Sequence, residues 1–238
     1  MRKVLIAGDS LSMSRHGFVN TIDTYAAKLQ MLLDDTLVVN AAQRGCDSER
    51  LLTEEYLLEN IWPLQPDHIV IQVGIVDCTP RLFTQMQKRI LSAMQRIIVL
   101  RNVANVIIRT ASSNRYAITK KKSRPLVPRD RFESNLRAFI AETRRVRPNC
   151  SISLINIPCP GGEILGRNWG ILELVNTYNG LISAISDGCN GNVVDLYELT
   201  RQNHDFLLAD GYHIDSNAHN FICVELERIE NSASCEPV

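Results

Sequence analysis

Short runs of apolar residues alternate with amphipathic stretches from one end of the chain to the other. The runs are rich in β-branched residues and are apolar at consecutive positions, which is typical of strands covered on both faces of a sheet. We predict strands at residues 3–7, 36–41, 68–73, 105–110, 151–157 and 192–195.

The stretches between these runs place apolar residues at helical spacing. We predict helices at residues 21–33, 48–60, 81–101, 129–147, 172–186 and 217–230. Thr21, Asp47 and Ser216 stand at or just before the start of three of these helices and are residue types that commonly cap them.

Strand and helix alternate throughout, and no repeat, linker or low-complexity segment interrupts them. This order predicts one α/β domain over residues 1–238, built on a doubly wound parallel sheet. The two longest irregular segments, 111–128 and 158–169, each follow a predicted strand. We therefore expect both at the carboxyl edge of the sheet, where folds of this class bind ligands.

Composition narrows the class of protein. Hydrophobic residues make up 45% of the 238 residues, and Lys plus Arg equal Asp plus Glu at 26 each. With no net charge, only local patches could direct the chain to nucleic acid or to a membrane, and we predict neither as a partner. No apolar run approaches the roughly eighteen residues of a membrane span. The first apolar run is too short for a secretory signal, so we expect a cytoplasmic protein.

The seven cysteines, at positions 46, 78, 150, 159, 189, 223 and 235, agree with a reducing compartment. They are odd in number, scattered, and never spaced as C-x-x-C. We expect most of them to be small buried apolar groups. Because no paired-cysteine or H-E-x-x-H pattern occurs, no metal site is predicted.

Ser10 follows the first predicted strand in the motif G-D-S-L at residues 8–11, and D-G-Y-H stands at residues 210–213. A serine hydroxyl is a poor nucleophile until a base takes its proton, and that base needs a third group to orient it. Ser10 alone could cap a helix, and Asp210 alone could form a turn before Gly211. The three-residue spacing of Asp210 and His213 favours the catalytic interpretation.

These motifs resemble those of the SGNH hydrolases, also called the GDSL esterase/lipase family. Four blocks carry the resemblance: G-D-S-L at 8–11, N-A-A-Q-R-G at 40–45, G-I-V-D at 74–77, and D-G-Y-H at 210–213 with a second histidine at 219. The resemblance implies a three-layer, flavodoxin-like α/β fold without a cofactor. It also implies that Ser10 is the nucleophile, His213 the base and Asp210 its orienting partner. The backbone N–H groups of Ser10 and Gly45 would bind the oxyanion.

One position departs from the family pattern. The third block normally supplies an asparagine amide to the oxyanion, and this chain has Val76 there. Loss of one such donor typically lowers kcat by about a hundredfold to a thousandfold. Arg44, Arg81 and Asn114 are our candidates for a replacement donor.

Around the substrate we place six residues: Asp9, Arg44, Gly74, Asp77, Arg81 and Asn114. Asp9 and Asp77 are also expected to accept backbone N–H bonds and stiffen the loops that carry them. His219 is assigned a packing or capping role. His16, His68 and His204 belong to no motif, and we predict no catalytic function for them.

A basic run extends from Arg115 to Arg131 and includes Lys120, Lys121 and Lys122. Such a run is usually a solvated loop. Because we expect it near the rim of the pocket, we also consider that it attracts an anionic substrate, such as a phosphorylated sugar.

The sequence therefore predicts a serine esterase that removes a short acyl group, most simply acetyl, from a polar alcohol such as a carbohydrate. Two alternatives stay open: a sugar O-acyltransferase using the same three residues, and a catalytically silent carbohydrate-binding protein, which Val76 would favour. The expected partner is a small-molecule or glycan ester, and the chain could also form a homo-oligomer.

Overall fold

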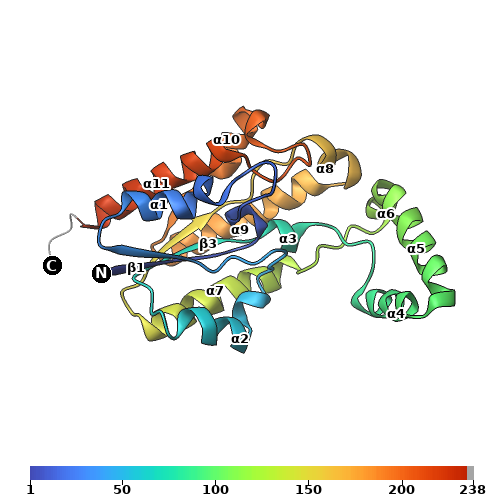
Figure 1. Cartoon of the computed structure of the whole chain (residues 1–238), viewed down its shortest axis with the longest axis horizontal. Helices are drawn as coiled ribbons and strands as arrows, with labels where there is room; N and C mark the ends of the chain where they lie inside the picture. The colour runs from blue at the N-terminus through green and yellow to red at the C-terminus, as the bar shows by residue number, and fades with distance from the viewer. Residues whose placement is uncertain (235–238) are drawn as a thin grey trace.

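Five parallel strands form the centre of the protein in a computed structural model, which describes residues 1–234 (Figure 1). The strands are β1 (Arg2–Gly8), β2 (Thr36–Asn40), β3 (His68–Gln72), β4 (Ser151–Ile155) and β5 (Asn192–Val194). Their order in the sheet is β2-β1-β3-β4-β5, with Val4 of β1 in register with Val38 on one side and His68 on the other. This is the flavodoxin-like order, in which ligands bind where the order reverses next to β1.

Helices cover both faces of the sheet, which confirms the predicted three layers. The helices are α1 (Tyr25–Leu32), α2 (Glu54–Tyr56), α3 (Ile75–Cys78), α4 (Gln85–Arg96), α5 (Ile98–Ser113), α6 (Arg115–Lys121), α7 (Arg129–Val146), α8 (Gly162–Arg167), α9 (Ile171–Gly188), α10 (Leu196–Gln202) and α11 (Ser216–Ser234). Shorter turns are η1 (Ser10–Ser12), η2 (Thr21–Asp23), η3 (Arg50–Leu52), η4 (Leu57–Ile61) and η5 (His204–Phe206).

Alternate side chains of each strand enter two separate cores. On β1, Val4 and Ile6 pack with α1 and α11, whereas Leu5 and Ala7 pack on the opposite face with α7 and α9. All four are fully buried. Burying an aliphatic side chain of this size stabilises the fold by about 1.5–3 kcal/mol, which explains why the strands read as continuous apolar runs.

Five of the six predicted strands are confirmed, and the strand predicted at residues 105–110 is wrong. Those residues lie within α5. The run Val106-Ile107-Ile108 is too short to separate strand from helix by its apolar character alone, and no sheet neighbour is available to it. The irregular segment predicted at 111–128 is also largely helical, because α5 continues to Ser113 and α6 follows it.

Three long predicted helices are confirmed as α7, α9 and α11. The predicted helix at 21–33 divides into η2 and α1, and the one at 48–60 divides into η3, α2 and η4. The helix predicted at 81–101 covers α4 and the start of α5. Asp47 accepts the backbone N–H of Arg50, the first residue of η3, although Glu49 holds the cap position. Thr24 caps α1 and Asp215 accepts the backbone N–H of Ala218 in α11, in place of Thr21 and Ser216.

Residues 82–123 leave the sheet layers and return to them, and we call this segment the helical arm. It contains α4, α5 and α6 and extends to one side of the molecule (Figure 1). The backbone N–H of Arg81 donates to the carbonyl of Arg124 at 3.0 Å, which closes the base of the arm. Within residues 1–234, no helix is both long and apolar enough to cross a membrane.

The six cysteines inside the described range are free thiols. Five are buried and Cys189 is half-buried, which confirms the expected packing role for most of them. Cys235 lies outside the described residues.

Candidate active site

The turn after β1 places Ser10 at the carboxyl edge of the sheet. The chain leaves β1 at Gly8, and the carboxylate of Asp9 accepts the backbone N–H of Leu11 at 2.8 Å, which caps η1. A side chain at position 8 would not fit, because its Cβ would lie 2.3 Å from the hydroxyl of Ser12 and 3.1 Å from a carbonyl oxygen of β3. The glycine and aspartate of the G-D-S-L motif therefore shape the turn that carries the serine.

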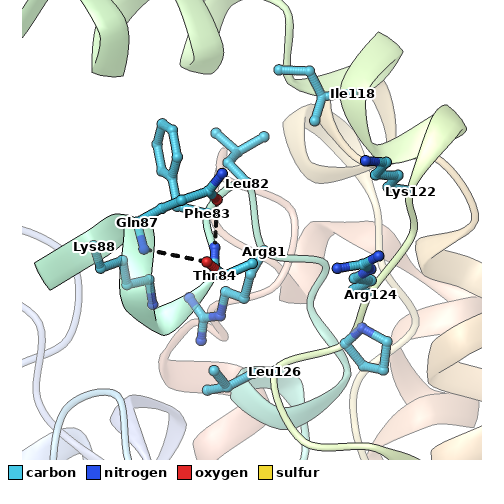
Figure 2. A pocket seen from close by; sticks show the side chains of 11 residues that line it. Arg81, Leu82, Phe83, Thr84, Gln87, Lys88, Ile118, Lys122, Arg124 and Leu126 are labelled. Carbon is cyan, nitrogen blue, oxygen red and sulfur yellow. Dashed lines mark hydrogen bonds between the residues drawn. The ribbon is translucent and has the colours of Figure 1, made fainter. Parts of the chain in front are cut away.

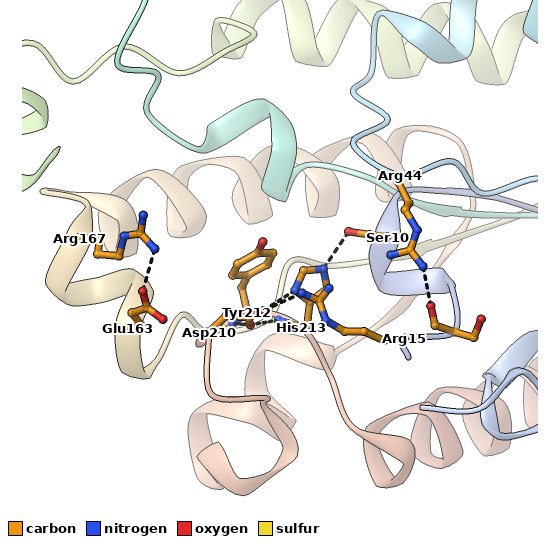
Figure 3. Close-up of polar contacts among 9 residues, drawn as sticks. Ser10, Arg15, Arg44, Glu163, Arg167, Asp210, Tyr212 and His213 are labelled. Carbon is orange, nitrogen blue, oxygen red and sulfur yellow. Dashed lines mark hydrogen bonds and ion pairs between the residues drawn. The ribbon is translucent and has the colours of Figure 1, made fainter. Parts of the chain in front are cut away.

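Ser10, His213 and Asp210 form one hydrogen-bonded chain (Figure 3). The hydroxyl Oγ of Ser10 lies 3.0 Å from Nε2 of His213, across 203 residues of sequence. On the other side of the imidazole, Nδ1 lies 2.7 Å from Oδ2 of Asp210. The second oxygen of Asp210 accepts the backbone N–H of His213 at 3.0 Å, so the loop itself holds the carboxylate in place. This is the geometry of a nucleophile, a base and an orienting carboxylate.

The charges in this chain suit proton transfer at neutral pH. Burial lowers the pKa of His213 below its usual value and outweighs the opposing effect of Asp210. A neutral imidazole can accept the proton of Ser10. Burial pushes the pKa of Asp210 upward, but its hydrogen bonds with His213 outweigh burial and lower the pKa. The guanidinium of Arg15, 3.3 Å from Oδ2 of Asp210, also supports the charged carboxylate.

A cavity of about 650 Å³ opens in front of Ser10 and includes Gly45 in its wall. Gly45 has a φ of +70°, a left-handed conformation that strains other residues. The backbone N–H groups of Ser10 and Gly45 donate to no acceptor within the described part of the chain. Both are therefore available to a group bound in the cavity.

Of the six residues predicted around the substrate, Arg81 alone lines this cavity. Arg44 is exposed and donates to the carbonyl of Ser14 at 3.0 Å, beside the cavity. Asn114 is exposed on the helical arm, where its amide donates to the carbonyl of Thr110. The predicted contact of Asn114 with substrate is wrong, because the segment expected to be a loop at the sheet edge is helical and leaves the sheet.

Gly74, Asp9 and Asp77, also predicted around the substrate, are buried and do not line the cavity. Gly74 begins α3 with a φ of +132°, and a Cβ there would lie 2.7 Å from Ile157. Asp77 of α3 accepts the backbone N–H of Ser48 at 2.9 Å, which ties α3 to the loop after β2. The predicted stiffening role of both carboxylates is confirmed. Burial raises the pKa of Asp9 to about 7 and that of Asp77 to about 6.

Val76 lines the cavity at the position where a side-chain donor was expected. Its side chain donates nothing, and its carbonyl accepts from Nη2 of Arg81 at 3.1 Å. Arg81 is therefore the one candidate replacement donor that the fold brings into the cavity.

Sequence reasoning missed three further guanidinium groups in the cavity wall, those of Arg15, Arg115 and Arg167. Arg167 pairs with Glu163 at 2.7 Å (Figure 3), and Arg115 donates to Asn168 at 2.7 Å. The segment 158–169 was expected at this edge, and α8 lies within it, so Arg167 could have been found there. Arg115 belongs to the basic run, but Arg15 stands in a loop without a motif.

A buried polar network packs against the turn that carries Ser10. The hydroxyl of Tyr25 donates to Ser12 at 2.8 Å, and Ser12 donates to Gln72 of β3 at 2.6 Å. His219 of α11 accepts the backbone N–H of Tyr25 at 3.3 Å. The packing role predicted for His219 is confirmed, and burial lowers its pKa to about 4.

The side chains of Cys46, Cys78 and His68 are buried in the packed interior. Burial raises the pKa of Cys46 to about 12 and raises that of Cys78 as well. His68 is buried between Glu230 and Ser153. Among residues 1–234, no group of three His, Cys, Asp or Glu side chains is arranged to hold a metal ion.

Comparisons with known proteins match the whole architecture. A family model described as "GDSL-like Lipase/Acylhydrolase family" matches residues 6–220. The solved structure of a lipase/acylhydrolase from Enterococcus faecalis is similar over 100% of this chain and 99% of its own, with a TM-score of 0.67 and 18% identity. The comparison with curated proteins finds no match.

Two further solved structures are similar at 18% identity. An acetylxylan esterase, Axe2, from Geobacillus stearothermophilus covers 95% of this chain and 93% of its own, with a TM-score of 0.61. A psychrotrophic esterase, EstA, from Pseudoalteromonas sp. covers 98% of this chain and 100% of its own, with a TM-score of 0.60. At this identity the likeness shows the fold.

Proposed function

The chain belongs to the GDSL-like lipase/acylhydrolase family and is a carboxylic ester hydrolase, and we propose that it removes a short acyl group from a polar alcohol through an acyl-serine intermediate. The observation that carries this proposal is the continuous hydrogen-bonded chain from Ser10 through His213 to Asp210, with distances of 3.0 Å and 2.7 Å.

In the first half of the reaction, Oγ of Ser10 attacks the ester carbonyl carbon while Nε2 of His213 takes the hydroxyl proton. The carbonyl π electrons move to oxygen, and the backbone N–H groups of Ser10 and Gly45 stabilise that oxyanion. When the tetrahedral intermediate collapses, the C–O bond to the alcohol breaks. His213 returns its proton to the leaving alkoxide, and the acyl group stays on Ser10.

In the second half, water takes the place of the alcohol. His213 accepts a proton from water as its oxygen attacks the acyl carbon, and the same N–H groups bind the second oxyanion. Collapse releases the carboxylic acid and returns the proton to Ser10. Asp210 stays ionised throughout and stabilises the imidazolium that forms in each half.

The cavity wall supports a polar alcohol in the substrate. Beside Ser10 it presents Arg15, Arg81, Arg115 and Asn168, groups that bind hydroxyl and anionic oxygens better than a long alkyl chain. Likeness to an acetylxylan esterase agrees with an acetyl group on a carbohydrate, although that substrate belongs to the other protein. The cytoplasmic location stays a prediction.

A fluorophosphonate probe tests the nucleophile directly. We expect covalent labelling of the natural protein and its complete loss in Ser10→Ala. Ser14→Ala is a matched control, since Ser14 lies four residues away and outside the cavity wall. Labelling that persists in Ser10→Ala, or that is lost equally in Ser14→Ala, would contradict the assignment.

The acceptor of the acyl group is tested by product analysis. With an acetyl ester and water alone, we expect free acetate in a yield that depends on Ser10. Adding a sugar that lacks the ester should leave the acetate yield unchanged. A shift of the product to acetylated sugar would instead assign the acyltransferase alternative.

A further inference from the structure

A second cavity, of about 380 Å³, lies where the helical arm joins the sheet layers (Figure 2). We call it the basic cavity, because its charged lining residues are Arg81, Lys88, Lys122 and Arg124. No carboxylate lines it, and none of these four cations forms an ion pair with a described carboxylate. Figure 2 shows Arg81 and Lys88 on one side and Lys122 and Arg124 on the other.

Arg81 belongs to both cavities, so the basic cavity adjoins the cavity in front of Ser10. Nη2 of Arg81 donates to the carbonyl of Val76, while its Nε is buried with no hydrogen-bond partner in the described chain. A buried, unpaired donor on a cation is costly unless a bound group satisfies it. Like charges also crowd here: burial, together with the charge of Arg81, lowers the pKa of Lys88.

We propose that the basic cavity binds an anionic oxygen group, a phosphate monoester in its simplest form, on the alcohol portion of the substrate whose ester lies at Ser10. This proposal rests on the proposed esterase function. Four cations around one cavity, without ion pairs in the described chain, would hold a phosphate dianion through charge-assisted hydrogen bonds. Arg81, shared by both cavities, would set the distance between the phosphate and the scissile ester.

The first test compares an O-acetylated hexose with its phosphate monoester. We expect kcat/KM to favour the phosphorylated ester, and the double variant Lys88→Gln/Arg124→Gln to reduce that preference roughly tenfold to a hundredfold. The matched control, Arg89→Gln/Lys121→Gln, removes two arm cations that do not line the basic cavity, and its preference should equal that of the natural protein. Equal preference in all three proteins would overturn the proposal.

A second test does not depend on catalysis. In Ser10→Ala, calorimetric titration should detect binding of the hexose phosphate but not of the free hexose, and Lys88→Gln/Arg124→Gln should abolish that binding. If the phosphate binds while fluorophosphonate labelling fails, the anion site stands and the esterase proposal falls. If labelling succeeds and no phosphate binds, the esterase stands and the anion site falls.

The outer surface of the helical arm carries a different inference. Exposed residues recur along its two longer helices at spacings of four, three and four positions, and all but the last are apolar. They are Met86, Ile90 and Ala93 of α4 with Ile97 just after it, and Val99, Val103, Val106 and Thr110 of α5. Val99 is 82% exposed and Met86 68%. This spacing is the seam by which helices pack on other helices.

The opposite charges of the arm and of the remainder of the chain indicate which surface covers the two seams. The arm contains nine Lys and Arg residues and no Asp or Glu, so the remainder of this neutral chain has a formal charge of −9. Arm-to-arm contact would bring like charges together, whereas an arm lying on the remainder of a second molecule would bring opposite charges together. Two copies can exchange such contacts reciprocally about a twofold axis.

We infer that the helical arm packs on a second copy of this chain. Light scattering should give the mass of a dimer for the natural protein, and raised salt should weaken the dimer. Val99→Ser/Val103→Ser should yield monomers with unchanged circular dichroism. Ile98→Ser/Ile107→Ser is the control, because these exposed apolar residues belong to the arm but lie outside the two seams. A monomeric natural protein, or a monomer that binds anionic lipid vesicles through the arm, would overturn the inference.

Discussion

The carboxyl edge of the sheet and the helical arm are built in opposite ways. At the sheet edge, the hydroxyl of Ser10 meets a partner 203 residues away in sequence, the imidazole of His213. In the arm, α4 and α5 pack on each other, and Leu91 and Ala104 are their buried residues among the described side chains. The contrast indicates that the sheet holds the Ser10 site in a fixed geometry. The arm instead exposes positive charge and apolar surface.

The largest expected effect follows from removing the orienting charge at the sheet edge. Asp210→Asn should lower kcat by about 10⁴-fold, because the amide favours the wrong imidazole tautomer. Steady-state kinetics with an acetyl ester would measure it. Asp205→Asn, an exposed carboxylate in η5, is the control and should behave like the natural protein. If the kcat of Asp210→Asn stays within tenfold of the natural value, the side chains at the sheet edge do not depend on this orienting carboxylate, and the contrast with the arm fails.

Packing should separate the two regions by their stability. Phe139 of α7 is fully buried, and Phe139→Ala should lower the free energy of unfolding by about 3–5 kcal/mol. Leu91→Ala in the arm should leave the main unfolding transition in place and speed hydrogen exchange in α4 and α5 alone, because the arm can open locally. Equal shifts of the main transition in both variants would mean that arm and sheet unfold together.

Restoring a donor at position 76 tests whether the sheet edge lacks part of its oxyanion site. Val76→Asn should raise kcat by up to about a hundredfold with little change in KM, because the amide would act on charge that develops in the transition state. Val76→Ala, which adds space but no donor, is the control. No gain with asparagine would indicate that Arg81 already fills this role.

The free energy of unfolding and kcat/KM should both depend on pH through groups in the sheet layers. The arm should not contribute through a carboxylate, because it has none. Because folding raises the pKa of Asp9 from 3.8 to about 7, the folded protein binds the proton more tightly between those values. The free energy of unfolding should therefore fall as pH rises through that window. Asp9→Asn should flatten the fall, as measured by urea titrations at several pH values.

The smallest effect concerns the base. Since burial lowers the pKa of His213 below 6.5, kcat/KM should rise with pH and level off once the imidazole is neutral, with a midpoint below that value. A pH–rate profile measures the midpoint. A midpoint above 6.5 would mean that Asp210 outweighs burial.

The sequence predicted the sheet and the hydrogen-bonded chain of Ser10, His213 and Asp210 because both depend on short, local patterns. Buried strands read as apolar runs, and the turn and loop that carry Ser10 and His213 have fixed spacings. Residues 105–110 of the arm were predicted as a strand but belong to α5. A run of three apolar residues occurs both in buried strands and on exposed helix faces, so the pattern cannot separate the two. Asn114 was misplaced because its segment is helical and leaves the sheet. Arg15 could not be placed, because its position depends on the path of a loop rather than on periodicity.

The uneven distribution of charge gives each copy of the chain a permanent dipole, with the arm as the positive pole. An approaching anion is drawn toward that pole, and the basic cavity lies at its inner end, next to Ser10. The encounter rate of anionic esters should therefore fall as ionic strength shortens the range of the field, while neutral esters arrive at a rate independent of salt.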